Sequence, residues 1–169
     1  MVTVRPRTAA DLDGCIEVLR HVHADSGYPV QGMDNAEAFL TEGRVKQAWI
    51  AEDDRHVIGH VAVSTATDDD VSVALWRNLH PDNDSIVILE RLFVHPERHG
   101  GGIATQLIKT AMAWGLDAGC RLVLFALVKD QAAMNLYKRL GWHTFGKTNY
   151  HWGDGEHMEA ICFVSPQAG

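Results

Sequence analysis

A chain of 169 residues, 46% of them hydrophobic, can bury a sizeable core within one compact domain. The formal net charge of −7 and the absence of a Lys/Arg run argue against a nucleic-acid partner held through phosphate contacts, although a small anion could still bind. Three scattered cysteines without a CxxC pair, and no apolar run long enough to span a bilayer, predict a cytoplasmic protein with no disulfide framework and no membrane partner.

The first part of the chain predicts a strand, two helices and a hairpin. "VTVRPRT", residues 2–8, alternates apolar and polar residues and is typical of a strand. Thr8 and Asp11 then form a T-x-x-D capping pattern, which a run of apolar residues at helical spacing follows. A loop and a short helix around Ala36 to Leu40 come next. "AWIAED" and "HVIGHVAVSTA" predict two strands joined by a turn at residues 53–55, so the first three strands should be antiparallel.

The second part of the chain predicts helices alternating with strands. Thr67 to Ser85 is a long connection in which "VSVALWRNL" could form a helix of its own. "IVILERLFV", residues 86–94, is a mostly apolar strand that should lie centrally in the sheet. Helical spacing runs from Gly102 to Gly119, and "RLVLFALV" predicts another buried strand. A helix from an N-cap at Asp130 to Gly141 and a hairpin around "GDG" complete the series.

In chain order these elements give β-α-α-β-β-(α)-β-α-β-α-β-β. This order predicts an α/β fold, with a mixed, largely antiparallel sheet flanked by helices. Because no repeat, linker or low-complexity segment divides the chain, we expect a single domain over residues 1–164. Residues 165–169 should form a short, frayed C-terminal tail.

Three consecutive glycines, Gly100 to Gly102, stand between a strand pattern and a helix pattern. Such a loop exposes successive backbone N–H groups at the positive end of a helix and can bind an anion, although a glycine-rich loop without a ligand is the alternative. The dinucleotide fingerprint G-x-G-x-x-G fails, because its third glycine would fall on Thr105. "GWHTFGKT", Gly141 to Thr148, matches the P-loop pattern but follows a helix and precedes none, so we interpret it as a chance match.

Two segments together resemble the signature of the GCN5-related N-acetyltransferases (GNAT): "LFVHPERHGGGIATQLI" and "DQAAMNLYKRLGW". In that family a Gln/Arg-x-x-Gly-x-Gly/Ala loop opens the main helix and receives the pyrophosphate of acetyl-coenzyme A. His99 stands at the first position of that loop, a change that leaves the backbone donors in place. The residues that would hold the cofactor under this resemblance are Leu92, Phe93, Val94, His99, Gly100, Gly101, Gly102, Ile103, Ala104, Thr105 and Asp130.

The second segment resembles the family pattern Asn-x-x-Ala-x-x-Leu-Tyr-x-x-x-Gly-Phe, with Asp130 in the place of Asn. That Asn often touches the cofactor, whereas an N-cap role alone would account for Asp130. The resemblance covers nearly the whole chain and implies a GNAT-like acyl-CoA N-acyltransferase fold. It further implies an acetyl-CoA-dependent enzyme that acetylates a primary amine by direct attack in a ternary complex.

The resemblance also implies catalytic roles, each with a structural alternative. The strand before the glycine loop would splay at a bulge and free the main chain of residues 92–94 to bond the pantetheine arm and the thioester oxygen. Tyr137 matches the tyrosine that protonates the coenzyme A thiolate, since a phenol has a higher pKa than a thiol. Its alternative role is a partly buried aromatic. Glu90 is the candidate base, and pairing with a neighbouring cation is its alternative.

Acceptor identity is left open by the sequence. Under the resemblance, Tyr28, Trp76, Tyr150 and Trp152 lie in segments that bound the acceptor pocket, and they would suit a small amine with an apolar body. A drug-like amine, a polyamine, an amino acid, and a protein N-terminus or lysine all stay possible. A non-catalytic acyl-CoA-binding or regulatory domain is the alternative function, and a homodimer is compatible with the family.

Metal and covalent chemistry are not expected. The ten histidines include pairs such as His21 and His23, but these pairs fall on different predicted elements and no third ligand follows at zinc-like spacing. Cys120 is more typical of a buried small residue than of an acyl-accepting nucleophile. The sequence therefore predicts neither a metal nor a covalent enzyme intermediate.

Overall fold

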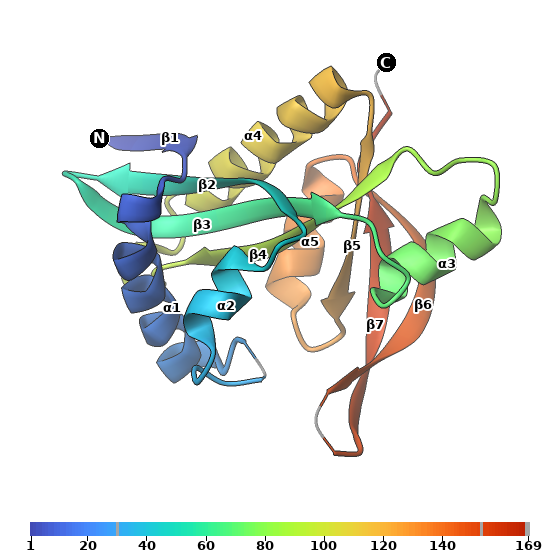
Figure 1. The fold of residues 1–169 in the computed structure, drawn as a ribbon, viewed down its shortest axis with the longest axis horizontal. Coiled ribbons are helices and arrows are strands. Elements are labelled where there is room, and N and C mark those ends of the chain that lie inside the picture. The colour runs from blue at the N-terminus through green and yellow to red at the C-terminus, as the bar shows by residue number, and fades with distance from the viewer. Residues whose placement is uncertain (30, 153, 168–169) are drawn as a thin grey trace. The chain divides into compact units, whose positions relative to one another are not determined.

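A computed structural model describes residues 1–29, 31–152 and 154–167 of the chain. Its strands form a seven-stranded, mixed and largely antiparallel sheet in the spatial order β1-β2-β3-β4-β5-β7-β6, flanked by helices (Figure 1). The predicted α/β fold and the predicted order of elements are confirmed. Contacts group the chain into two compact units, Met1–Ser64 with Glu90–Ala111 and Thr65–Leu89 with Met112–Gly169.

The bounds of the elements stay close to those expected from the sequence. The strands are β1 (Val2–Pro6), β2 (Val45–Asp53), β3 (His56–Thr65), β4 (Ile86–Val94), β5 (Arg121–Leu127), β6 (His143–Trp152) and β7 (Glu156–Val164). The α-helices are α1 (Leu12–Ser26), α2 (Ala36–Thr41), α3 (Val71–Leu79), α4 (Ile103–Ala118) and α5 (Gln131–Arg139), and two 3-10 turns are η1 (Ala9–Asp11) and η2 (Pro96–Arg98). Gly153, in the predicted "GDG" turn, lies outside the described residues.

The first unit contains the antiparallel strands β1, β2 and β3. β2 and β3 are joined through Asp54 and Arg55, whose φ angles of 50° and 67° are both left-handed, as in the tight turns that suit a hairpin. The predicted hairpin is therefore confirmed. On β3, a Cβ added to Gly59 would lie 3.1 Å from Leu107 Cδ1 of α4 and 3.3 Å from the carbonyl oxygen of Phe93. Glycine thus lets β3 approach α4 and β4 closely.

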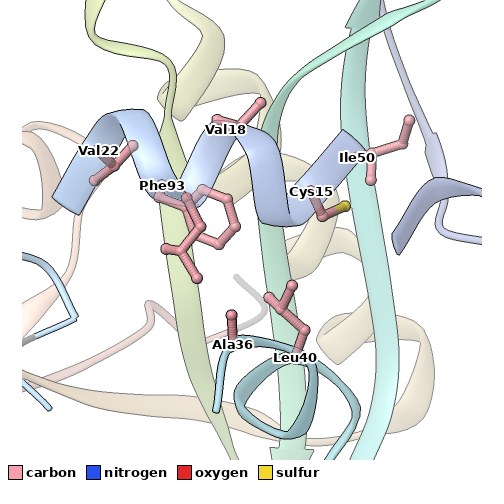
Figure 2. Packing of buried hydrophobic residues seen from close by; sticks show 8 residues of the cluster. Cys15, Val18, Val22, Ala36, Leu40, Ile50 and Phe93 are labelled. Carbon is pink, nitrogen blue, oxygen red and sulfur yellow. The ribbon is translucent and has the colours of Figure 1, made fainter. Parts of the chain in front are cut away.

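The core of the first unit lies between α1, α2 and the strands β2 and β4 (Figure 2). Its buried members are Cys15, Val18, Leu19, Val22, Ala36, Leu40, Ile50 and Phe93. The four residues from α1 recur at helical spacing, so one face of that helix is apolar. Burial of this face, rather than helix propensity alone, holds α1 and α2 on the strands.

The second unit has a core of its own. β5 is parallel to β4 at Ile86 to Ile88 and antiparallel to β7, which pairs with β6. The helix expected within the long connection is present as α3, and the Asp70 carboxylate caps it by accepting hydrogen bonds from the backbone N–H groups of Ser72 and Val73. Val73 and Trp76 of α3 pack in a cluster that includes residues of β4, β5 and β7.

Ser165, expected in the frayed tail, is held against β5. Its side-chain oxygen accepts from the Leu122 N–H at 2.9 Å, and its own N–H donates to the Leu122 carbonyl at 2.9 Å. The Arg121 guanidinium donates to the Ser165 carbonyl at 3.1 and 2.8 Å. Ser165 is buried, so the expectation of fraying is wrong at this residue because its polar groups continue the pairing with β5.

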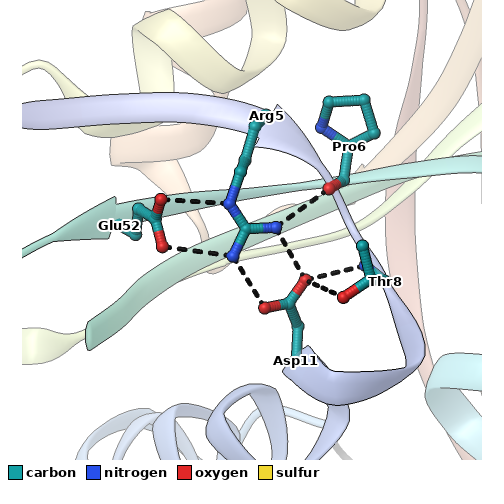
Figure 3. Close-up of polar contacts among 5 residues, drawn as sticks. All are labelled: Arg5, Pro6, Thr8, Asp11 and Glu52. Atoms are coloured by element: carbon teal, nitrogen blue, oxygen red, sulfur yellow. Dashed lines mark hydrogen bonds and ion pairs between the residues drawn. The ribbon is translucent and has the colours of Figure 1, made fainter. Parts of the chain in front are cut away.

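A charged network joins β1, β2 and the start of α1 (Figure 3). The Arg5 guanidinium donates to both carboxylate oxygens of Asp11, at 2.9 and 2.8 Å, and to both of Glu52, at 3.0 and 3.1 Å. The Asp11 carboxylate also accepts from the Thr8 N–H at 2.7 Å, which confirms the acidic half of the predicted capping pattern. Hydrogen bonding to Arg5 lowers the pKa of Asp11 to about 2.

Replacing Asp11 should therefore destabilise the fold in a pH-dependent way. Because the folded pKa lies below the ordinary 3.8, the stabilisation is present above that value and is lost as the pH falls toward 2. Arg5 is partly exposed, so we expect Asp11→Asn to lower the free energy of unfolding at pH 7 by about 1–2 kcal/mol, after discounting for solvent screening. Urea unfolding at pH 7 and pH 2 measures this difference.

Glu17→Gln provides the matched control, because Glu17 forms an exposed ion pair with Arg20 on the outside of α1. This control should change the free energy of unfolding by less than about 0.5 kcal/mol. An equal effect of the two variants at pH 7 would contradict the assigned role of the Arg5 network.

Candidate functional site

The backbone of β4 is irregular at Arg91. Its φ of 56° is left-handed, which is uncommon for a residue other than glycine. An isolated residue of this kind inside a strand is typical of a bulge, which redirects the strand beyond it. The irregularity lies directly before Leu92, Phe93 and Val94, the segment at which the family resemblance implies a bulge.

The carbonyl of this irregular residue is bound by His60 of β3. His60 Nδ1 lies 2.8 Å from the Arg91 carbonyl oxygen, and His60 Nε2 lies 2.9 Å from Arg7 Nη1. A carbonyl only accepts and a guanidinium only donates, so His60 carries its proton on Nδ1 and is neutral. His60 is 0% exposed, and burial lowers its pKa to about 4, which agrees with this assignment.

Arg91 and Arg7 both bind the last turn of α2. Arg91 Nε donates to the Phe39 carbonyl at 3.1 Å, and Arg7 Nη1 donates to the Leu40 carbonyl at 2.8 Å. The Arg91 guanidinium also lies 3.9 Å from the ring centroid of Phe39 and pairs with Glu42 at 3.1 Å. Carbonyls at a helix end lack intrahelical donors, and these two arginines supply them.

Glu90, the candidate base, has two polar neighbours in the structure. Ser64, which is buried on β3, donates its hydroxyl to Glu90 Oε2 at 2.6 Å, and Arg91 Nη1 lies 3.6 Å from Glu90 Oε1. The cation pairing that the sequence left as an alternative is thus present. The side chain of Glu90 is still 14% exposed, so the carboxylate keeps some access to solvent.

The strand residues after the bulge pack and bond within the first unit. Phe93 is buried and stacks on the His60 ring, with centroids 5.0 Å apart and an interplanar angle of 13°. Leu92 is half-buried. The Val94 carbonyl accepts from His99 Nε2 at 3.3 Å. His99 therefore ties the start of the glycine loop to the end of β4.

The glycine loop leads directly into α4. Gly100 and Gly102 have φ angles of 85° and 77°, and apart from the adjacent residues no described atom lies within 4 Å of where a Cβ would be at either position. Backbone conformation, rather than crowding by the protein, therefore requires glycine here. The Gln106 N–H donates to the Gly102 carbonyl, so the N–H groups of residues 103–105 (Ile103, Ala104 and Thr105) precede the first intrahelical hydrogen bond. This loop and helix start form a chemically suitable anion cradle.

Tyr137 and Asp130 lie in the second unit. Tyr137 on α5 is 5% exposed, and its ring centroid lies 5.3 Å from that of Trp142 and 5.7 Å from that of Phe163. Asp130 is the N-cap residue of α5, as predicted, but its carboxylate accepts none of the helix N–H hydrogen bonds. Partial desolvation raises the pKa of Asp130.

The four aromatic residues predicted to bound the acceptor pocket have different surroundings in the structure. Tyr150 stacks on Phe125 at 4.7 Å between ring centroids and lies 5.9 Å from Trp152, so these aromatics form a row along β5 and β6. Tyr28 is half-buried in the first unit with its ring 6.0 Å from that of Phe39. Trp76 is 2% exposed and donates from Nε1 to the Asn83 carbonyl at 3.0 Å. Trp76 therefore has a packing role, and we leave it out of the acceptor site.

A groove of about 660 Å³ lies along α2 and the loop before it in the first unit. Its polar and aromatic lining includes Gln31, Asp34, Asn35, Phe39, Glu42 and Arg91. Gln31 and Asp34 belong to the segment "SGYPVQGMD", which the resemblance implies as a boundary of the acceptor pocket. Sequence reasoning missed Asn35, Phe39, Glu42 and Arg91, together with Arg7 and His60. The available signal was the polar His60 within the apolar stretch "HVIGHVAV", since a buried polar side chain requires hydrogen-bond partners.

Lys147 and Thr148 of the P-loop-like match lie in strand β6, which agrees with a chance match. Within the described residues, no group of three or more His, Cys, Asp or Glu is arranged to hold a metal ion. Cys15 and Cys162 are buried, and burial raises the pKa of each thiol to about 12. None of the described helices combines the length and the apolar character needed to cross a membrane.

Comparisons with known proteins agree with the sequence motifs. The model of the acetyltransferase (GNAT) family matches residues 16–142. Over 69 residues the chain is 39% identical to the thialysine N-epsilon-acetyltransferase of Bos taurus, covering 35% of this chain and 41% of that protein. Over 127 residues it is 28% identical to N-acetyltransferase 8B of Homo sapiens, covering 72% of this chain and 51% of that protein. The chain thus spans about half, or less, of the length of these curated relatives.

A solved structure shares the fold along nearly the whole chain. Arabidopsis thaliana NAA60 in complex with acetyl-CoA superposes with a TM-score of 0.72 and 19% sequence identity, covering 97% of each chain. At this level of identity the likeness concerns the fold.

Burial of neutral His60 should make the stability depend on pH. Its folded pKa of about 4 lies below the ordinary 6.5, so the stabilisation is complete above pH 6.5 and is lost as the pH falls through 4. The shift corresponds to a loss on the order of 3 kcal/mol in the free energy of unfolding. Urea unfolding between pH 7 and pH 4 measures it, and His60→Gln should show a shallower dependence.

Asp11→Asn should retain the wild-type dependence between pH 6.5 and 4, because the pKa of Asp11 affects stability at lower pH. Equal slopes for wild type and His60→Gln in that range would show that His60 is not the group responsible.

Proposed function

Because the chain belongs to the acetyltransferase (GNAT) family, we propose that it is a cytoplasmic, acetyl-CoA-dependent N-acetyltransferase acting on the primary amine of a small molecule. The observation that carries this proposal is the glycine loop with left-handed Gly100 and Gly102 at the start of α4, preceded by a left-handed residue in β4. The two features occur in the order that the family motif requires. The N-acetyltransferase names of the curated relatives support the same reaction class.

The glycine loop would hold the pyrophosphate of acetyl-CoA. Gly100 to Gly102 and the N–H groups of residues 103–105 offer donors beside the positive end of α4. The open space at Gly100 and Gly102 fits this use, because a ligand could approach the backbone there. The NAA60 structure contains acetyl-CoA, which supports the choice of co-substrate for this fold.

Acyl transfer to an amine needs a polarised thioester carbonyl, a neutral amine and a proton for the departing thiolate. Backbone groups of residues 92–94 are proposed to polarise the thioester that acetyl-CoA supplies. Glu90 would accept the amine proton, directly or through water, with Ser64 fixing one oxygen of its carboxylate. Tyr137 would supply a proton to the thiolate, as its place in the second motif implies. The amine attacks the thioester directly, so no enzyme side chain is acylated.

The acceptor is proposed to be a cationic small amine with an apolar body. Asp34 and Glu42 line the groove beside α2 and would attract a protonated amine, although Glu42 is shared with Arg91 and Arg44. Tyr28, which is half-buried in the same unit as the groove, is the candidate for packing against its body. For Tyr150 and Trp152 of the second unit, contact with the acceptor stays a prediction from the sequence. Acetylation of a protein N-terminus or lysine is the alternative that an acceptor panel must include.

The activity is tested by release of coenzyme A thiol from acetyl-CoA across a panel of amines, amino acids and peptides. We expect at least one small amine to support turnover, and Tyr137→Phe to lower kcat by about 10²-fold with little change in KM for acetyl-CoA. Acetyl-CoA binding without turnover for any acceptor would instead favour a non-catalytic acyl-CoA-binding domain. An unchanged kcat and pH profile in Tyr137→Phe would remove Tyr137 from the mechanism.

The cradle is tested by Gly102→Ala. A left-handed backbone costs about 1–2 kcal/mol for residues other than glycine, so the loop should relax and the KM for acetyl-CoA should rise about tenfold. Gly119→Ala is the matched control, because Gly119 follows the other end of α4 with a similar φ of 73°. Gly119→Ala should lower stability without changing this KM. A similar rise in KM for both variants would indicate general destabilisation instead of a cradle at Gly102.

A further inference from the structure

The left-handed backbone of Arg91 requires support from its surroundings. A residue with a side chain seldom keeps a positive φ inside a strand unless neighbouring groups fix it. Here the carbonyl of Arg91 is fixed by His60, and the guanidinium of the same residue is fixed by the Phe39 carbonyl and Glu42. Both the main chain and the side chain of Arg91 are therefore anchored.

His60 is itself held on three sides. Its Nε2 accepts from Arg7, its Nδ1 donates to the Arg91 carbonyl, and its ring lies flat against Phe93. Arg7 is fixed in place by its second bond, to the Leu40 carbonyl of α2. Such a ring has little freedom to turn, so its Nδ1–H points at one carbonyl in one direction.

Packing alone does not account for an imidazole at this position. The neighbouring β3 residues Val61, Ala62 and Val63 are apolar and 0% exposed, and an apolar side chain at residue 60 would avoid the cost of burying polar ring atoms. With an apolar side chain, however, the Arg91 carbonyl and one Arg7 donor would lose a buried partner. An imidazole has one donor and one acceptor nitrogen, and these satisfy the Arg91 carbonyl and the Arg7 donor.

We propose that His60 is a positioning residue for acyl transfer: through its bond to the Arg91 carbonyl it sets the direction of the β4 backbone at Leu92 and Phe93. This inference rests on the proposed function, in which that backbone receives the thioester. We call Arg7, His60 and Arg91 together the clamp. The clamp also fixes the last turn of α2, and the groove is lined by Phe39 of that turn and by Glu42, which follows it. The clamp thereby links the acceptor groove to the thioester-binding strand within the first unit.

Two substitutions separate the two bonds of His60. The amide nitrogen of Asn reaches the position of Nδ1, so His60→Asn can still donate to the Arg91 carbonyl while losing the bond from Arg7. The amide of Gln reaches the position of Nε2, so His60→Gln can still accept from Arg7 while losing the bond to Arg91. Both variants carry a polar amide side chain. They differ because His60→Asn keeps the bond to the Arg91 carbonyl and His60→Gln keeps the bond from Arg7.

The experiment measures kcat, both KM values and the dissociation constant of acetyl-CoA for wild type, His60→Asn and His60→Gln, with thermal unfolding at pH 7.5 as the folding control. We expect His60→Gln to lose about 10- to 100-fold in kcat and His60→Asn to remain within about threefold of wild type, at comparable melting temperatures. A kcat near that of wild type in His60→Asn but not in His60→Gln identifies the bond to the Arg91 carbonyl as the one needed for turnover. Equal kcat values for both variants and wild type would overturn the proposal, as would losses that follow the melting temperature in both variants.

Failure of the proposed function gives a different result. If wild type turns over no amine but binds acetyl-CoA, the acetyltransferase proposal fails, while weaker binding by His60→Gln than by His60→Asn still supports the positioning of β4. Equal acetyl-CoA affinities for the two variants in that case would overturn the positioning role. A wild-type protein that does not bind acetyl-CoA at all would overturn both proposals.

Discussion

A carbonyl displaced from regular strand geometry needs a donor within the protein, and at Arg91 that donor is the buried imidazole of His60. The bond has consequences well beyond one residue, because His60 is bound by Arg7 and both arginines bind the end of α2. A buried neutral ring between a guanidinium group and a backbone carbonyl is stable only where each of its nitrogens has a complementary partner. One set of hydrogen bonds therefore holds the irregular strand β4, the short helix α2 and the residue that follows β1, and the apolar core adds packing.

Sequence reasoning recovered the elements whose signals are local. Periodicity gave the order of strands and helices, and positive φ angles at Gly100, Gly102, Gly119 and Gly141 stand where helix ends and the loop were expected. The left-handed conformation of Arg91 had no such signal, because an arginine in an apolar strand carries no preference for a positive φ. The carbonyl of Arg91 is bound by His60, a residue 31 positions away in the chain, and no local pattern reveals such a partner. Trp76 shows that residue type alone does not predict whether a side chain lines a pocket. An aromatic residue on a helix between two loops can pack in a core or line a pocket, and the burial of Trp76 assigns it to the core.

The family likeness and the acceptor question rest on different parts of the molecule. The family match of residues 16–142 covers the strand, glycine loop and helices that carry the GNAT motif. The fold that holds these elements also occurs in a structural relative of 19% identity. Acceptor choice depends on loops and on side chains such as Asp34 and Glu42, which the fold does not specify. The groove beside α2 is lined by both polar and apolar groups, and its only described cationic lining residue, Arg91, already has carbonyl, carboxylate and aromatic partners. Glu42 is likewise paired, with Arg91 at 3.1 Å and with Arg44 at 2.6 Å, so we propose Asp34 as the lining carboxylate that attracts a cationic ligand.

The burial of two of the three thiols has a practical consequence for reagents that detect sulfhydryl groups. Such reagents react with thiolates, and a pKa of about 12 leaves Cys15 and Cys162 almost entirely protonated at neutral pH, in addition to being sterically shielded. Cys120, at the entrance to β5, is the half-buried exception. The native chain should therefore consume about one equivalent of a disulfide-exchange dye, whereas the denatured chain should consume three. The same difference makes Cys120 a natural attachment point for a single fluorophore without removal of the other cysteines.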